Sequence, residues 1–387
     1  MINISKKEEC CGCEACRQIC PQDCITMTID NEGFLYPMVD EGVCVDCGAC
    51  QRVCPVLHQA DTLKPLAVYG AKSNDGNIRK NSSSGGMFRL LAIETIENGG
   101  VVFGARFDSS TETIVHDYTQ TIDGIAPLQR SKYVQSVIGD NFIKAKEFLK
   151  QGKRVLFAAT PCQIAALRLF LNKEYENLTL VDFVCHGVPS PGVFARYIGE
   201  IKRSKKIKTI NNINFRSKKN SWRHYDFLVD YNHTRSQFSQ SRYKNPFLKG
   251  FFSDLYLRPS CHSCPSKGGK SGSDITLADF WGVENIAPII NDDMGVSLVM
   301  ISSPKGDLLY NKIEKQSMVI PNFHHQGSYM ESSKPNPQRE FFFNQINNGH
   351  AVIKIVNHLT RLKWQERLMR AIRYLKSRVK NYIKSHL

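Results

Sequence analysis

A repeated cysteine pattern near the N-terminus constrains this chain more than any other feature. The spacing C-x-x-C-x-x-C-x-x-x-C, followed by proline, occurs at Cys10, Cys13, Cys16 and Cys20 and again at Cys44, Cys47, Cys50 and Cys54. Three closely spaced thiolates bind three corners of a 4Fe-4S cube, and in two-cluster ferredoxins the fourth cysteine reaches the other cube. The spacing therefore predicts two clusters with crossed ligands. One is expected on Cys10, Cys13, Cys16 and Cys54, and the other on Cys44, Cys47, Cys50 and Cys20.

Zinc is the alternative for paired cysteines, but zinc motifs separate their two halves more widely than one tight run of four. Gly12 and Gly48 can relieve crowding where the backbone approaches a cluster. Cys11 and Cys24 fall outside the repeat, and we expect them to pack as small buried side chains near the clusters. Residues 1–62 are thus predicted to form an α+β ferredoxin-like domain with two 4Fe-4S clusters.

The first nine residues are polar and charged, and no later stretch reaches the roughly 18 apolar residues of a membrane span. We therefore expect a cytoplasmic protein. In that compartment thiols stay reduced, so the 14 cysteines are expected to serve metal or redox chemistry rather than disulfides.

Charge is distributed unevenly along the chain, whose net charge is +15. Residues 1–60 hold 4 basic and 9 acidic side chains, which gives −5. Residues 201–250 hold 13 and 2, which gives +11, and residues 361–387 hold 9 and 1, which gives +8. This layout favours different partners for different parts, among them a redox partner protein or a soluble electron carrier. No nucleic-acid module accompanies the charge, so we expect no nucleic-acid partner.

From residue 63 to residue 345, short β-branched runs alternate with helical patterns, which is typical of an α/β layer fold with a mixed sheet. Strands are expected at 68–73, 101–107, 154–160, 178–185, 274–282 and 296–303. Helices are expected at 85–97, 142–150, from 163 onward, and at 193–201, 307–316 and 338–346. The basic, aromatic stretch 203–250 indicates an antiparallel excursion or a long functional loop.

Four cysteines remain outside the N-terminal domain: Cys162, Cys185, Cys261 and Cys264. Cys162 follows a strand-to-helix junction and Cys185 ends a strand. Because the carboxyl ends of parallel strands line a ligand crevice, these two thiols can meet there. The set fits a further cluster or a zinc ion. Cys162 alone also fits an activated nucleophile at a helix start, and the C-x-x-C pair fits a dithiol, so the residues leave these alternatives open.

Six segments resemble, in the same order, the coenzyme F420 hydrogenase/dehydrogenase beta subunit family. They are NSSSGGMFRLLA (81–92), SKYVQS (131–136), ATPCQIAALR (159–168), VDFVCHGVPSP (181–191), FRSK (215–218) and CHSCPSKGGKSGSDITLADFWG (261–282). The resemblance implies a flavin-binding α/β domain that passes electrons between iron–sulfur clusters, FAD and a soluble acceptor or donor. In methanogens that acceptor is a deazaflavin coenzyme, in plants a relative reduces a chlorophyll intermediate, and many bacterial relatives lie in surface-polysaccharide gene clusters.

The resemblance also implies a third 4Fe-4S cluster on the four remaining cysteines, close to the flavin. Residues 82–86 precede a helix whose free N–H groups can receive the FAD pyrophosphate, although a plain serine N-cap explains the same residues. Lys132 to Gln135 and Asp279 to Gly282 have ordinary packing as their alternative. The flavin candidates are Ser83, Ser84, Gly85, Gly86, Lys132, Tyr133, Gln135, Thr160 and Asp279.

His186 is the candidate catalytic residue, because it stands beside Cys185 where it can donate to a flavin or a substrate. A structural histidine at a strand end is the alternative. The basic stretch contains Trp222, Arg223, His224 and Tyr225. These side chains are candidates to clamp an anionic acceptor or to stack on its ring.

Residues 346–387 are expected to form a basic, amphipathic, helical tail. Apolar side chains recur there at helical spacing, at Trp364, Leu368, Ile372, Leu375, Val379 and Ile383. Basic side chains are interleaved, at Arg367, Arg370, Arg373, Lys376, Arg378, Lys380 and Lys384. This pattern is typical of an interfacial helix and predicts peripheral attachment to the anionic inner face of the cytoplasmic membrane. Packing on the protein's own core or on a partner is the alternative.

The sequence therefore favours an iron–sulfur, flavin-dependent oxidoreductase whose substrate is unknown. The first alternative is an electron-transfer subunit of a larger complex, linked to surface polysaccharide biosynthesis and without a substrate of its own. The second is a redox-inert or regulatory partner in a glycan-assembly complex, which would bind no flavin.

Overall fold

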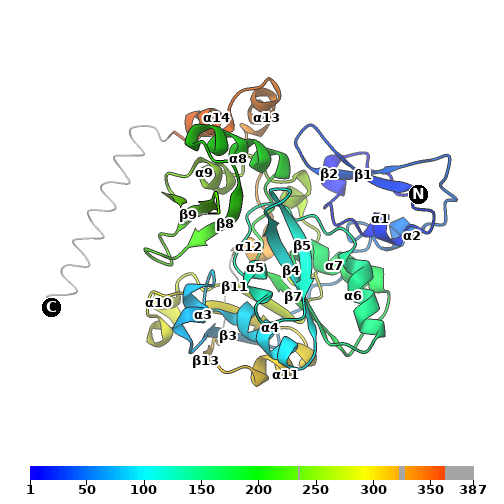
Figure 1. Cartoon of the computed structure of the whole chain (residues 1–387). Helices are drawn as coiled ribbons and strands as arrows, with labels where there is room; N and C mark the ends of the chain where they lie inside the picture. The colour runs from blue at the N-terminus through cyan, green and yellow to red at the C-terminus, as the bar shows by residue number, and fades with distance from the viewer. Residues whose placement is uncertain (234–235, 322–326, 362–387) are drawn as a thin grey trace.

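The computed structural model describes residues 1–233, 236–321 and 327–361. The amphipathic helix expected beyond residue 361 lies outside the described residues and stays a prediction. Among the described residues, no helix is long and apolar enough to cross a membrane. Figure 1 shows an N-terminal lobe, a large sheet flanked by helices, and a smaller sheet with helices of its own.

The N-terminal lobe combines a β-hairpin with short helical turns. Its elements are η1 (Lys7–Glu9), α1 (Ala15–Ile19), β1 (Ile25–Ile29), β2 (Leu35–Val39) and α2 (Ala49–Arg52). The cysteine repeat is also a repeat of backbone conformation. Gly12 and Asp46, at equivalent positions, have φ of 66° and 49°, and Glu14 and Gly48 have φ of 62° and 71°. Left-handed residues at the same places in both halves turn each loop tightly around its cysteines, at a cost of about 1 kcal/mol for each non-glycine residue.

The central sheet of the body has eight strands in the order β13-β3-β12-β11-β7-β6-β4-β5. Its strands are β3 (Ala67–Lys72), β4 (Val101–Asp108), β5 (Thr113–Thr119), β6 (Val155–Ala158), β7 (Leu178–Phe183), β11 (Ile275–Asp279), β12 (Ser297–Ile301) and β13 (Gln316–Val319). β4, β6, β7 and β11 are parallel to their neighbours in this series, and the outer strands pair antiparallel. The expected mixed sheet is therefore present.

Helices cover both faces of this sheet. They are α3 (Gly76–Lys80), α4 (Met87–Glu97), α5 (Ile125–Leu128), α6 (Asn141–Lys150), α7 (Pro161–Leu171) and α11 (Pro304–Lys312). Val102 and Leu156 belong to the apolar cluster under α4, whereas Val101 and Val155 belong to the cluster under α6 and α7. Adjacent strand residues thus point to opposite cores, which is why these strands are apolar without alternation.

The expected helix at 307–316 differs from the structure. α11 ends at Lys312, and residues from Gln316 pair with β3 as the edge strand β13. The pairing partner of β13 is more than 200 residues away, so no local pattern marks this short polar strand.

Residues 203–250 form mainly an antiparallel sheet rather than a long loop. Its strands are β8 (Ile210–Ser217), β9 (Asp226–Tyr231) and β10 (Gln237–Ser241), in the order β10-β9-β8. The helices beside it are α8 (Pro191–Lys205), α9 (Pro246–Phe252), α13 (Arg339–Asn347) and α14 (Val352–Leu359). α13 crosses the expected domain boundary at residue 345, and Val352, Ile355 and Val356 of α14 are buried in the aromatic core of this sheet. Residues 346–359 therefore pack on the body.

The ferredoxin lobe is docked on the body through an apolar cluster, which Ala15 and Val53 share with α6 and α7, and through polar contacts. Glu32 forms a two-pronged ion pair with Arg339, both N–O distances being 2.6 Å. Gln18 of α1 accepts from the backbone N–H groups of Phe142 at 3.0 Å and Ile143 at 3.3 Å, so a ferredoxin side chain satisfies the start of α6. The remaining short elements are η2 (Pro259–Ser263), α10 (Val283–Ile286), η3 (Pro288–Ile290) and α12 (Gly327–Met330).

Candidate functional site

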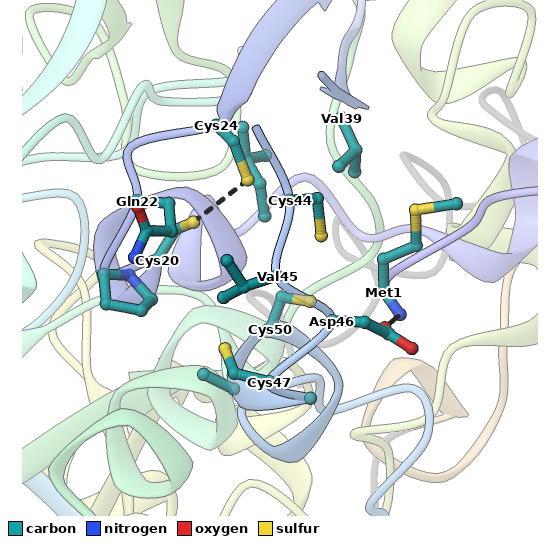
Figure 2. Close-up of a pocket in the computed structure, with 14 residues that line it drawn as sticks. Met1, Cys20, Gln22, Cys24, Val39, Cys44, Val45, Asp46, Cys47 and Cys50 are labelled. Atoms are coloured by element: carbon teal, nitrogen blue, oxygen red, sulfur yellow. Dashed lines mark hydrogen bonds and ion pairs between the residues drawn. The ribbon is translucent and has the colours of Figure 1, made fainter. Parts of the chain in front are cut away.

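The second cysteine run surrounds a small pocket in the ferredoxin lobe. Cys20, Cys44, Cys47 and Cys50 line this pocket, together with Cys24. Figure 2 shows their sulfur atoms around a common space. The Sγ atoms of Cys20 and Cys24 are 3.4 Å apart, and the N–H of Ile2 donates to Cys50 Sγ at 3.2 Å. Cys20 thus leaves its own run and joins the second one.

The first run gains Cys54 in return. Cys54 lies close enough to Cys10 and Cys16 for their charges to interact. Burial raises the pKa of the Cys16 thiol to about 12. The two cysteine sets are therefore crossed, as in two-cluster ferredoxins. Their bonding to iron remains a prediction.

The four remaining cysteines lie at the carboxyl edge of the central sheet. β6 and β7 are neighbouring parallel strands, so Cys162 after β6 and Cys185 after β7 come together. η2 carries Cys261, and Cys264 follows its last residue. The N–H of Val188 donates to Cys261 Sγ at 3.4 Å, and the charge of Cys261 interacts with those of the other three. The fold thus brings together thiols that are up to 102 residues apart in the sequence.

These thiols are poor nucleophiles as placed. Contact with the Cys11 thiol, followed by burial, raises the pKa of Cys162 well above its ordinary value. Burial also raises the pKa of Cys185 to about 12. An activated cysteine requires the opposite shift, so the structure argues against Cys162 as a catalytic nucleophile.

The four side chains do not form a site for a single metal ion. Within the described ranges, no group of three or more His, Cys, Asp or Glu side chains could hold one metal ion. A cube of four irons makes a different demand, because each thiolate bonds its own iron. All 14 cysteines are free, so the thiols are chemically available for such a cube.

Cys11 joins the ferredoxin lobe to the body. Its side chain is 5% exposed, and its thiol interacts with those of Cys13 and Cys162. The first ferredoxin set and the sheet-edge set are therefore adjacent. Cys24, which we also expected to be buried, is 7% exposed and lines the pocket of the second cysteine run.

The loop Ser83–Gly86 is held against the same edge of the sheet. Gly85 N donates to Ser297 Oγ at 3.0 Å, and a Cβ on Gly85 would clash with the carbonyl oxygen of Ala71. Ser83 Oγ accepts from the N–H of Ser131 at 2.8 Å. Gly86, at φ 93°, caps the N-terminus of α4. The loop is thus wedged between β3, β12 and the 131 segment, with a helix start directly behind it.

Buried and partly buried cations lie beside this loop. Lys218 Nζ donates to Ser84 O at 2.8 Å and to Met294 O at 2.9 Å. Burial, reinforced by Arg216 and Arg79, lowers the pKa of Lys218 to about 7. Arg216 is 3% exposed and pairs with Asp279, yet its Nε and Nη2 have no hydrogen-bond partner among the described residues. Unpaired buried donors are costly, so they indicate a place for an acceptor.

The other flavin candidates do not all gather at this loop. Lys132 donates to Pro127 O at 2.8 Å and to Gln129 O at 2.5 Å, and burial lowers its pKa well below the ordinary range. Tyr133 stacks on Phe251 with centroids 4.8 Å apart.

Two candidates lie with the cysteines instead. Gln135 donates to Cys11 O at 2.9 Å and accepts from Arg258 at 3.0 Å. Thr160 Oγ1 lies 3.4 Å from Cys162 Sγ. These two residues support the cysteine sites.

His186 follows Cys185 in the chain and contacts Asp254 and Phe251. Its Nε2 is 2.5 Å from Asp254 Oδ1, and its ring meets that of Phe251 edge-on at 5.5 Å. The side chain is 38% exposed, so a proton can exchange with solvent there.

Comparisons with known proteins agree with this organisation. A family model for the C terminus of the coenzyme F420 hydrogenase/dehydrogenase beta subunit matches residues 152–321, and a 4Fe-4S dicluster domain matches residues 9–57. These two matches support the coenzyme F420 hydrogenase/dehydrogenase beta subunit family for this chain. The family resemblance drawn from the six segments is confirmed. The chain carries an iron–sulfur ferredoxin-type domain ahead of a mixed α/β domain.

Among solved structures, one similar chain comes from the F420-reducing NiFe hydrogenase complex from Methanosarcina barkeri. The two chains are 16% identical with a TM-score of 0.45, and the match covers 77% of this chain and 93% of that chain. A similarity of this size supports no functional comparison. A search of curated proteins found no match.

The structure separates the side chains at 222–225 that the sequence proposed as an acceptor clamp. Trp222 is buried and stacks on Trp281 at 5.0 Å, and Tyr225 is also buried. Arg223 is neutralised by Glu284 at 3.0 and 2.6 Å. Arg242 instead lies over the rings of Tyr225, Tyr243 and Phe252 at 4.8, 5.2 and 5.0 Å. Trp222 and Tyr225 are therefore core residues, which the sequence pattern does not show.

Three cationic residues were missed as site candidates: Arg216, Lys218 and Arg258. The segment FRSK, which contains the first two, carried part of the family resemblance and was the available signal. Arg258 stands between an apolar run and the C-x-x-C pair, where a single charge is conspicuous.

Proposed function

We propose that this chain passes electrons among two ferredoxin clusters, a third 4Fe-4S cluster on Cys162, Cys185, Cys261 and Cys264, and FAD bound beside the Ser83–Gly86 loop. One observation carries the proposal. The carboxyl edge of the central sheet presents the thiols after β6 and β7, then Asp279 at the end of β11, then Ser297 at the start of β12, which contacts the loop. Thiols and loop thus occupy one continuous edge.

The sheet-edge thiols fit a cubane cluster by number, partial burial and surroundings. Their raised pKa values favour protonation when they are free, so binding of iron must displace the protons. Lys267 donates to Cys185 O and to Ser328 O, the latter at 2.7 Å, and places a positive charge near the site. That charge would offset the negative charge of four thiolates.

The loop fits the diphosphate of FAD by charge and shape. Gly85 leaves no room for a side chain, the partly buried Lys218 and the buried Arg216 supply positive charge, and Gly86 caps the start of an 11-residue helix. Phosphate oxygens would accept from the unpaired Arg216 N–H groups and from the start of α4. Asp279 would keep Arg216 oriented.

Bound FAD would exchange electron pairs with a soluble substrate and single electrons with iron–sulfur clusters. This chain's residues would hold it and manage protons. His186, fixed by Asp254, is the candidate to hold the exchanged proton at Nε2 or Nδ1. Arg242 and its aromatic neighbours form a half-open cationic surface suited to an anionic, ring-containing acceptor.

An electron-transfer subunit without its own substrate is the second candidate, favoured by the acidic ferredoxin lobe, whose net charge is −5 over residues 1–60. In that case the lobe would dock on a basic redox partner protein. The isolated protein would then carry all cofactors yet show no turnover with soluble acceptors.

The test is an anaerobic purification with iron, sulfide, zinc and released flavin quantified on one sample. We expect about twelve irons per chain, four per cluster, and one non-covalent FAD. Cys261→Ser and Cys162→Ser should each remove about four irons and leave the ferredoxin spectrum intact.

Zinc in place of the third iron increment would refute the third cluster. Loss of different cofactors in the two cysteine variants would show that the thiols do not share a site. FMN, or no flavin at all, would refute the FAD assignment while leaving the iron–sulfur assignment standing.

A further inference from the structure

Arg258 is a fully buried cation at the junction of the ferredoxin lobe and the body. Its side chain is 0% exposed. Its Nε donates to Cys10 O at 2.7 Å, and its Nη2 donates to Leu35 O at 2.9 Å and contacts Cys10 Sγ at 3.5 Å. Both of these acceptors belong to the ferredoxin lobe, whereas Arg258 belongs to the body.

The protein leaves this charge without a carboxylate. Among the described residues, no Asp or Glu forms an ion pair with Arg258; its partners are carbonyls, the amide of Gln135, and the rings of Phe34 and Tyr36 at 5.3 and 4.3 Å. Burying an unpaired charge costs several kcal/mol. A negative group that is absent from the polypeptide would offset this cost.

Thiols of both cysteine sites face the guanidinium. The charge of Arg258 interacts with Cys10 and Cys11 of the lobe and with Cys261 and Cys162 of the body. The lobe is shaped to admit it, since a Cβ on Gly12 would lie 2.6 Å from Arg258 Nη1 and 2.6 Å from Gln135 Nε2. The φ of 66° at Gly12 adds a second reason for glycine.

We propose that Arg258 raises the reduction potential of the ferredoxin cluster held by Cys10 above that of the distal cluster, which is the one predicted on Cys20, Cys44, Cys47 and Cys50. The Cys10 cluster then becomes the electron exit toward the body. The inference rests on the proposed function, because it requires a cluster at Cys10.

The physical reason is electrostatic. One-electron reduction adds a negative charge to a cluster, and a fixed, desolvated positive charge stabilises the reduced state. A hydrogen bond to a ligand sulfur acts in the same direction. The described cations beside the second cluster, on Cys20, Cys44, Cys47 and Cys50, are exposed: Arg52 donates to Cys47 O at 3.0 Å, and the Met1 ammonium is paired with Asp46, so water screens both charges.

The experiment is redox potentiometry followed by electron paramagnetic resonance on the full chain. Arg258→Met removes the charge and keeps the length of the side chain, and Arg258→Lys restores the charge. We expect Arg258→Met to weaken reduction of one ferredoxin cluster by about tenfold or more, a drop of about 59 mV per tenfold for a one-electron couple. The lysine variant should recover most of that shift.

Arg52→Met is the matched control. It should change the reduction equilibrium constant of either ferredoxin cluster by less than about twofold. If Arg258→Met does not fold, Gln135→Glu replaces it, because a carboxylate 3.0 Å from the guanidinium neutralises the charge and should shift the same cluster in the same direction.

Unchanged potentials with intact clusters, or equal shifts of both ferredoxin clusters, would overturn the role of Arg258. A wild-type protein that shows no reducible ferredoxin clusters would instead reject the cluster assignment in the proposed function. The two failures are therefore distinguishable.

Discussion

Lys218 shows how much one partly buried side chain can control. Its ammonium is held by two carbonyl oxygens, Ser84 O and Met294 O, at the edge of the proposed phosphate site. Burial and the neighbouring Arg216 lower its pKa to about 7, so its charge changes near neutral pH. The folded protein therefore carries a cation whose presence depends on pH at the place where an anion would bind.

We predict that FAD binding weakens as pH rises through about 7, by up to about tenfold per unit, because the protonated lysine attracts the diphosphate. The stability of the protein without FAD should instead rise with pH. The pKa is lower in the folded protein than in the unfolded chain, so stability rises with pH between the two values. FAD titration of deflavinated protein from about pH 6 to about pH 8.5 measures the first effect.

Lys218→Arg is the control, because arginine stays charged over this range and should bind FAD with a flat pH profile. Lys218→Met should bind weakly at every pH. A wild-type affinity that does not change with pH would contradict the role of Lys218.

The loop between β3 and α4 is the element that shapes the proposed flavin site. It is fastened by hydrogen bonds from Ser84 Oγ to Val296 O at 2.7 Å and from Ser73 N to Gly85 O at 2.8 Å. Its glycine at position 85 faces backbone atoms of β3 and β12. Because backbone cannot move aside as a side chain can, the position tolerates no Cβ.

Gly85→Ala should therefore displace the loop and weaken FAD retention by about tenfold or more, with a loss of about 1–3 kcal/mol of stability from overpacking. Gly76→Ala is the control on the adjacent α3, where an added Cβ meets nothing within 4 Å. Gly76→Ala should leave the FAD content unchanged and raise the free energy of unfolding by about 0.4–1 kcal/mol.

Released-flavin fluorescence and thermal unfolding measure both effects, and the ferredoxin absorbance serves as an internal reference. Wild-type FAD content in Gly85→Ala would show that the loop does not contact the flavin.

At the scale of the whole molecule, electron transfer requires the ferredoxin lobe to stay docked. Gly33 of the lobe and Gly192 of α8 meet backbone to backbone, since a Cβ on Gly192 would lie 2.7 Å from Gly33 Cα. The Glu32–Arg339 ion pair lies next to this contact in the chain. The segment 57–64, which joins lobe and body, is exposed, so the lobe is held by its packing on the body: these contacts, the buried Arg258 contacts, and the apolar cluster that Cys11, Ala15 and Val53 share with α6 and α7.

We predict that Gly192→Ala loosens the lobe and speeds proteolytic cleavage within 57–64 by several-fold, because a methyl group must push two backbones apart. Gly199→Ala on the same helix is the matched control, as its Cβ would meet only the Arg203 guanidinium at 3.5 Å. Limited proteolysis followed by mass spectrometry measures the rates. Equal cleavage rates in both variants would show that the Gly33–Gly192 contact does not limit docking.

The sequence by itself determined the features that depend on short spacing. Cysteine repeats, strand-length apolar runs and helix starts are local, and the ferredoxin domain, the mixed α/β body and the family resemblance followed from them. Burial and long-range pairing are not local. They turned Trp222 and Tyr225 into core residues, made β13 from residues expected to lie at the end of a helix, and packed α14 on the body.

Tertiary structure alone decided which distant groups meet. Arg258 reaches Cys10 across 248 residues, and Lys218 reaches Ser84 across 134. Such contacts are set by how the sheet edge, the small sheet and the ferredoxin lobe pack. A charge in the sequence shows neither its partner nor its distance from water, and these two quantities control its energy.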